Sequence, residues 1–206
     1  MSSQVNSQVN SQMGNPAISV QAAKKGQRHV CVFCGSHSGQ DAHYAGAAQV
    51  LGRHLVQSGL GLVFGGGKVG LMGVVADAVL EAGGHVIGVI PERLVEQELA
   101  HPGVQHLIVT SSMHERKQSM FDHADAFLAL PGGMGTLDEL CEIMTWSMLG
   151  LHDKPIGLLN TASYFDALLR FLEHSEAAGF LRAHHRALLR VEATPQALLA
   201  RLGLTA

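Results

Sequence analysis

The chain has 206 residues, of which 47% are hydrophobic and 15% charged, and its formal net charge is −3. A chain of this length is expected to form one domain with a large core. Its negative charge argues against nucleic acid as a partner, because duplex binding needs a basic face. The sequence has neither an apolar run of bilayer length nor the apolar core of a secretion signal, so we expect no membrane partner and a cytoplasmic location.

Residues 1–27 differ in composition from the rest of the chain. The unit Ser-Gln-Val-Asn occurs twice, at 3–6 and at 7–10, and polar residues dominate up to Lys24-Lys25-Gly26. A segment this polar cannot bury enough apolar surface to offset the entropy lost on folding. We therefore predict a disordered N-terminal tail over 1–27 and one globular domain over 28–206.

Within 28–206, short apolar runs alternate with segments of helical periodicity. We predict strands over 29–33, 60–64, 85–90, 104–109, 126–130, 155–159 and 187–191. We predict helices over 41–58, 71–82, 113–123, 136–149 and 164–178, an irregular stretch before Gly103, and a last helix that begins at Thr194-Pro195. This alternation is typical of a parallel sheet with helices on both faces, so the predicted fold is α/β and Rossmann-like in a single domain.

Two of the predicted strand-to-helix turns are rich in glycine. They are Gly65-Gly-Gly-Lys-Val-Gly70 and Pro131-Gly-Gly-Met-Gly135. Ligands bind at the carboxyl ends of parallel strands, and the free N–H groups of a helix N-terminus can hold a phosphate. Outside the second turn, the residues of possible phosphate loops are Gly35 and Ser36, which follow the strand 29–33, and Gly66, Gly67 and Gly70 of the first turn. For each glycine taken alone, close packing of strand against helix is the alternative.

Neither turn matches a complete dinucleotide-binding or Walker A pattern. The spacing Gly65-x-Gly67-x-x-Gly70 fits the dinucleotide fingerprint, but the next strand ends without a clear ribose-binding acid, and Lys68 is followed by valine where Walker A has Ser or Thr. Three cysteines give no disulfide framework, and we interpret Cys31-x-x-Cys34 as buried thiols. The thirteen histidines lack metal-site spacing, so we expect neither metal nor cofactor.

Arg116 has an electrostatic conflict that predicts an anionic partner. Ser112-x-x-Glu115 is a capping box that begins a helix at Met113, and cations near a helix start oppose the helix dipole. Either an acid of the protein, such as Glu115 or Asp122, or the phosphate of a ligand could compensate Arg116.

Glu139 also has two interpretations. Thr136-x-x-Glu139 is itself a capping box, in which the glutamate would only bond back to the Thr136 N–H. A carboxylate one turn into a helix that starts at a phosphate loop can instead serve in catalysis. The residues leave both interpretations open.

The sequence contains the motifs Met113-His-Glu-Arg-Lys117 and Pro131-Gly-Gly-Met-Gly-Thr-Leu-Asp-Glu139. Together they resemble the LOG family, the cytokinin riboside 5′-monophosphate phosphoribohydrolases, which are often mislabelled lysine decarboxylases. The resemblance runs from Val30 to the last helix. It implies a metal-free, Rossmann-like homodimer that hydrolyses the N-glycosidic bond of nucleoside 5′-monophosphates, cytokinin ribotides and AMP among them, to free base and ribose 5-phosphate.

The resemblance also assigns residues. The family's catalytic arginine and glutamate fall on Arg116 and Glu139, with Arg116 either holding the phosphate or assisting the leaving base. The implied substrate-binding residues are Glu98, Arg116, Lys117, Gly133, Met134, Gly135, Thr136, Leu137, Asp138, Glu139 and Thr145. Many members have Tyr in place of Met134 and Glu in place of Asp138, which leaves the base preference open between adenine and isopentenyl-type adenine.

A non-catalytic carrier or sensor of a nucleotide-like cofactor is the alternative function, because a fold alone does not fix a function. The combination of Arg116 with Glu139 separates the two. A protein that only binds phosphate gains nothing from a carboxylate that repels its ligand.

Overall fold

The computed structural model describes residues 26–97, 99–104 and 106–205. Most of the predicted tail and the predicted substrate contact Glu98 lie outside these residues, so both stay predictions. Within the described part of the chain, no helix combines the length and the apolar character that a membrane crossing would need.

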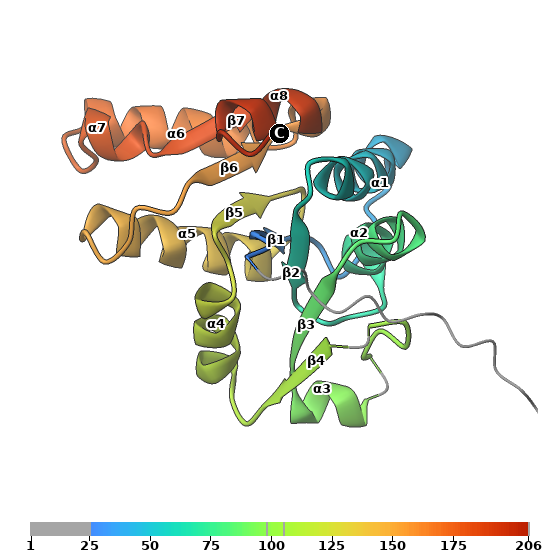
Figure 1. Cartoon of the computed structure of the whole chain (residues 1–206). Helices are drawn as coiled ribbons and strands as arrows, with labels where there is room; N and C mark the ends of the chain where they lie inside the picture. Colours follow the sequence, from blue (N-terminus) through green and yellow to red (C-terminus); the bar gives the residue numbers. More distant parts are fainter. Residues whose placement is uncertain (1–25, 98, 105, 206) are drawn as a thin grey trace, which may run out of the picture.

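Seven parallel strands form one sheet in the order β4-β3-β2-β1-β5-β6-β7 (Figure 1). The strands are β1 (His29–Phe33), β2 (Gly61–Phe64), β3 (Val86–Pro91), β4 (His106–Thr110), β5 (Ala126–Ala129), β6 (Ile156–Leu159) and β7 (Leu189–Glu192). The strand order reverses at β1, which pairs with both β2 and β5. In such sheets the crevice at the reversal is where ligands bind.

Helices cover both faces of the sheet, as the alternating pattern predicts. They are α1 (Ala42–Gln57), α2 (Gly70–Glu81), α3 (Glu92–Glu96), α4 (Met113–Asp122), α5 (Met134–Met148), α6 (Asp166–Ala177), α7 (Ala183–Arg186) and α8 (Pro195–Arg201), with a 3₁₀ turn, η1 (Thr161–Ser163), before α6. Side chains of α1, α2 and α8 pack on one face of the sheet, and those of α4, α5 and α6 on the other. Successive strand residues alternate between the two cores: Val30 and Val32 contribute to the first, Cys31 and Phe33 to the second.

The predicted element boundaries differ from the observed ones in three instructive places. Helices α3 and α7 were not predicted, because four or five residues are too few to show a helical period. The helix predicted from Tyr164 starts two residues later, because α6 begins at Asp166, and the 3₁₀ turn η1 that comes before Tyr164 was not predicted. Helix α5 begins at Met134 and not at Thr136, which changes the interpretation of its first turn.

Candidate active site

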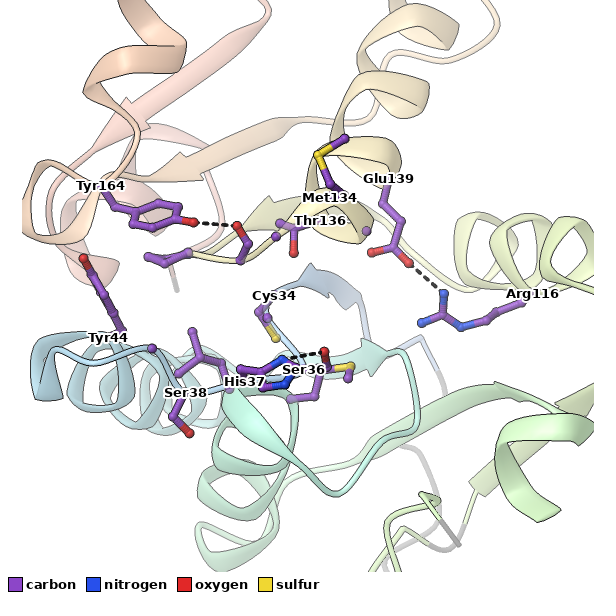
Figure 2. Close-up of a pocket in the computed structure, with 18 residues that line it drawn as sticks. Cys34, Ser36, His37, Ser38, Tyr44, Arg116, Met134, Thr136, Glu139 and Tyr164 are labelled. Carbon is purple, nitrogen blue, oxygen red and sulfur yellow. Dashed lines mark hydrogen bonds and ion pairs between the residues drawn. The ribbon is translucent and has the colours of Figure 1, made fainter. Parts of the chain in front are cut away.

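A cavity of about 420 Å³ lies at the carboxyl ends of β1 and β5, at the reversal of strand order (Figure 2). The loop after β1, Tyr44 of α1, the start of α2, the loop and first turns of α5, and Tyr164 form its wall. Arg116 reaches the same cavity from α4.

The first turn of α5 opens into this cavity. Its N-cap is Gly133, with an extended backbone and no side-chain hydrogen bond to the cap among the described residues. The N–H groups at the start of a helix have no partner inside the helix, and the helix dipole places positive charge there. This turn can therefore accept an anion of the size of a phosphate.

The capping-box interpretation of Thr136 and Glu139 is wrong. Thr136 is the third residue of α5 rather than its N-cap, so its hydroxyl is not in the position that caps a helix. Its side chain is buried and packs against Gly132, where a Cβ would overlap the Thr136 hydroxyl oxygen. Gly132 thus lets the loop fold tightly onto the first turn of α5.

Glu139 instead forms an ion pair with Arg116 at the end of the cavity away from Tyr164 (Figure 2). Arg116 Nη1 donates to Glu139 Oε1 at 2.8 Å, and Arg116 Nε donates to the carbonyl oxygen of Val89 in β3 at 3.1 Å. The two side chains are only 10% and 12% exposed. A Cβ at Gly65 would overlap the guanidinium, so this glycine makes room for Arg116.

This pairing corrects the partners predicted for Arg116. Glu115 accepts hydrogen bonds from the N–H and hydroxyl of Ser111, at 2.8 and 2.7 Å, and Asp122 accepts one from Gln118 at 2.8 Å. The capping of α4 is confirmed, because the Ser112 hydroxyl accepts from the Glu115 N–H at 3.1 Å. The predicted acids therefore serve α4 itself, while a glutamate 23 positions further along neutralises Arg116.

The environment of Glu139 shifts its proton affinity. Burial raises the pKa of the Glu139 carboxyl, and the neighbouring Arg116 guanidinium opposes that rise. A carboxylate whose pKa lies above its usual range accepts a proton more readily near neutral pH. The pair is therefore suited to general-base chemistry as well as to stabilising positive charge.

The structure divides the predicted substrate contacts into two groups. Those that line the cavity are Arg116, Gly133, Met134, Gly135, Thr136 and Glu139. Lys117, Leu137, Asp138 and Thr145 do not line it. Lys117 Nζ lies 2.8 Å from Asp138 Oδ2, Leu137 packs against the core, and the Thr145 hydroxyl donates to the Cys141 carbonyl at 2.7 Å.

The possible phosphate loops divide in the same way. Gly35 and Ser36 line the cavity, but Gly66, Gly67 and Gly70 do not. At Gly66 (φ 73°) and Gly70 (φ 63°) the backbone is in the left-handed region, and a Cβ would meet Ile90 or the backbone of Ser36. The packing interpretation fits these two glycines better than the phosphate interpretation.

Several residues that line the cavity were not among the predicted site residues. They include Gly39, Tyr44, Leu71, Met72 and Tyr164. The position of Tyr164 was accessible in principle, because it follows the carboxyl end of β6 and the carboxyl ends of parallel strands share one edge of the sheet. Among the described residues, no group of three or more His, Cys, Asp and Glu side chains is arranged to bind a metal ion.

Comparison with known proteins identifies the family. Residues 72–202 match the family model described as "Possible lysine decarboxylase". The chain is 46% identical to cytokinin riboside 5′-monophosphate phosphoribohydrolase LOG3 of Arabidopsis thaliana over 175 residues, which are 85% of this chain and 81% of that protein. It is also 46% identical to the probable cytokinin riboside 5′-monophosphate phosphoribohydrolase LOGL1 of Oryza sativa subsp. japonica over 187 residues, which are 90% of this chain and 84% of that protein.

Solved structures share the fold at lower identity. The molybdenum cofactor binding protein of Rippkaea orientalis aligns with a TM-score of 0.66 at 20% identity, covering 87% of this chain and 98% of that one. The Moco carrier protein of Chlamydomonas reinhardtii aligns with a TM-score of 0.65 at 22% identity, covering 86% and 97%. These likenesses confirm the Rossmann-like α/β fold. The family match and the identity to curated relatives confirm the resemblance found in the motifs: the chain belongs to the family of the cytokinin riboside 5′-monophosphate phosphoribohydrolases.

Proposed function

We propose that this protein hydrolyses the N-glycosidic bond of cytokinin riboside 5′-monophosphates, and of AMP, and releases the free base and ribose 5-phosphate. Relatives that are 46% identical over most of their length carry this activity in their names. The observation that supports the proposal most directly is the Arg116–Glu139 pair, because it shares one cavity with the uncapped start of α5.

The substrate phosphate would bind at the first turn of α5. The N–H groups of Gly133, Gly135 and Thr136 belong to this turn and can donate to phosphate oxygens. The exposed backbone of Gly133 and Gly135 lets a phosphate approach without meeting a side chain at these positions. The ribose would then extend toward Glu139, which lies in the second turn of the same helix.

Glu139 would act on the ribose. As the bond between C1′ and the base nitrogen breaks, its electron pair leaves with the base, and positive charge develops on C1′ and the ring oxygen. The ionised carboxylate stabilises that charge and accepts a proton from water, whose oxygen bonds to C1′. Transfer of this proton from Glu139, through solvent, to the base nitrogen then releases the neutral base and restores the ionised carboxylate.

Arg116 would support this step in two ways. Its charge and its 2.8 Å hydrogen bond hold Glu139 ionised and oriented. A guanidinium has five N–H donors, and Glu139 and Val89 accept two of them in the structure. The remaining donors are suited to the phosphate or to the leaving base.

The assay follows from the products. The protein is incubated with AMP and, separately, with isopentenyladenosine 5′-monophosphate, and the released base and ribose 5-phosphate are measured by chromatography. We expect both products in equal amounts from each active substrate, and the ratio of rates gives the base preference. A folded protein that binds both nucleotides but releases no base would be a carrier, and the proposal would be wrong.

We also propose that the protein is a homodimer. Several large apolar side chains are exposed in the single chain, including Met113, Met134, Leu149 and Leu151 near the start of α4 or the ends of α5. Such side chains are candidates for burial in a subunit interface. Light scattering at micromolar concentration should give twice the chain mass of 21.8 kDa or a multiple of it, and an active monomer would contradict this proposal.

A further inference from the structure

Tyr164 follows a strained backbone segment at the edge of the cavity. Ala162 and Ser163, which come directly before it, have φ angles of 50° and 59°. Non-glycine residues rarely adopt this left-handed conformation, because their Cβ crowds the following carbonyl oxygen. Two consecutive residues of this kind persist only where the surrounding structure holds them, and such strain gathers at functional sites.

The side chain of Asn160, which comes before this segment, bonds to the residues that come after it. Its side-chain Oδ1 accepts a hydrogen bond from the Phe165 N–H at 2.8 Å, and its Nδ2 donates to Asp166 Oδ1 at 2.8 Å. The Tyr164 N–H donates to the Thr161 carbonyl at 3.1 Å. The turn between β6 and α6 is therefore fixed, and the direction of the Tyr164 side chain is fixed with it.

The Tyr164 side chain bonds to the loop before α5. Its hydroxyl donates to the carbonyl oxygen of Gly132 at 2.6 Å (Figure 2). Its ring packs edge-to-face on Tyr44 and on Phe165, with ring centroids 5.4 and 4.8 Å apart. The hydroxyl thus links the turn after β6 to the glycine loop after β5.

We infer that Tyr164 is a positioning residue for the phosphate seat, by which we mean the first turn of α5 where the proposed function places the substrate phosphate. The Tyr164 hydroxyl fixes the peptide unit that joins Gly132 to Gly133. A trans peptide is planar, so the Gly132 carbonyl and the Gly133 N–H belong to one rigid unit and point in opposite directions. Holding the carbonyl toward Tyr164 therefore holds the Gly133 N–H away from Tyr164. That N–H belongs to the N-cap residue of α5, where the proposed function places the phosphate.

This peptide needs an external restraint, because glycine stands on both sides of it. Glycine adopts both signs of φ with similar ease, so the intrinsic backbone preference at Gly133 does not fix the orientation of the Gly132–Gly133 peptide. A Cβ at Gly133 would contact nothing within 4 Å, so no neighbouring group crowds this residue on its side-chain side. The Tyr164 hydroxyl supplies the restraint from outside the loop.

The test measures binding without turnover. AMP and adenosine are titrated by calorimetry into Glu139→Gln and into the double variant Glu139→Gln, Tyr164→Phe. Phe keeps the ring and its contacts but removes the hydroxyl. We expect the Kd for AMP to rise about two- to tenfold, as for the loss of one hydrogen bond. The Kd for adenosine, which has no phosphate, should stay within twofold.

A second measurement uses the active enzyme. With Glu139 intact, Tyr164→Phe should raise the KM for AMP more than it lowers kcat, and it should leave the midpoint of thermal unfolding nearly unchanged. A residue with a purely structural role would instead lower thermal stability and weaken both ligands alike.

The outcomes separate this inference from the proposed function on which it rests. Equal AMP affinity with and without the hydroxyl, or equal losses for AMP and adenosine, would overturn the inference. A wild-type protein that binds AMP but releases no base would overturn the proposed function alone, since the calorimetric comparison does not require turnover. Failure of Glu139→Gln to bind AMP would overturn the phosphate seat and, with it, the inference.

Discussion

Replacing Glu139 with Gln removes one charge from the cavity and keeps an oxygen where Arg116 needs an acceptor. The glutamine amide cannot accept a proton from water and carries no charge to stabilise a positive ribose. General-base catalysis by a positioned side chain contributes about 10² to 10⁴-fold, so turnover of AMP should fall by that factor. Base release measured by chromatography under saturating AMP gives this number.

The same substitution should cost some stability. Breaking a buried ion pair by removing one partner costs about 3–5 kcal/mol. The loss here should be smaller, about 1–2 kcal/mol, because both side chains border a cavity and the amide oxygen can still accept the Arg116 N–H. For a chain of this size we expect the midpoint of thermal unfolding to fall by about 2–8 °C.

Glu142→Gln is the matched control. Glu142 lies on the same helix, does not line the cavity, and is 3.5 Å from Lys117 Nζ. The same change of charge there should leave turnover within about twofold. Wild-type turnover by Glu139→Gln would refute the catalytic role of the carboxylate. Equal loss in both variants would show that charge on α5, and not the position of Glu139, controls activity.

Three further predictions follow from the geometry of the cavity. Adenosine should give a much lower kcat/KM than AMP, because binding at the remote phosphate aligns the sugar, and ATP should be poor because the seat is small; comparable values for adenosine and AMP would contradict this. Burial raises the pKa of Glu139, and its ionised form is the active one, so kcat/KM should fall as the pH decreases. The inflection should lie above the usual carboxyl pKa of about 4.3, and Glu139→Gln should lose it. Gly65→Ala should displace the Arg116 guanidinium and lower kcat/KM by about 10²-fold, a value expected for a misplacement of about 1 Å; unchanged kinetics would show that Arg116 tolerates the shift.

The sequence predicts the fold well because the signals involved are local. Each strand is a short apolar run and each long helix shows its own period, so the α/β alternation is readable without any tertiary contact. The predicted strand and long-helix ends fall within a few residues of the observed ones. For α6 the predicted start is Tyr164 and the observed start is Asp166. Helices α3 and α7 and the 3₁₀ turn η1, which span about one turn each, have no usable signal in the sequence.

The site is predictable only where it follows from the sheet. The loop at Gly133 and the loop at Gly35 were predicted to bind a ligand because both follow parallel strands, and both line the cavity. The partner of Arg116 was not predictable in this way, because it depends on how α4 packs beside α5. A shift of two residues in the start of α5 was enough to turn Thr136 from an expected cap into a buried side chain.

The glycines of the loop after β2 illustrate why a motif can be important for a site that it does not line. Their spacing resembles a nucleotide loop, yet Gly65 accommodates the Arg116 guanidinium and Gly70 accommodates the backbone of Ser36. The Leu71 N–H then donates to the Gly35 carbonyl at 3.0 Å, which ties this loop to the one after β1. The loop after β2 therefore supports two parts of the cavity wall without lining the cavity at these glycines. Substitution of the glycines should affect catalysis by displacing Arg116 and Ser36 and not by removing a phosphate contact.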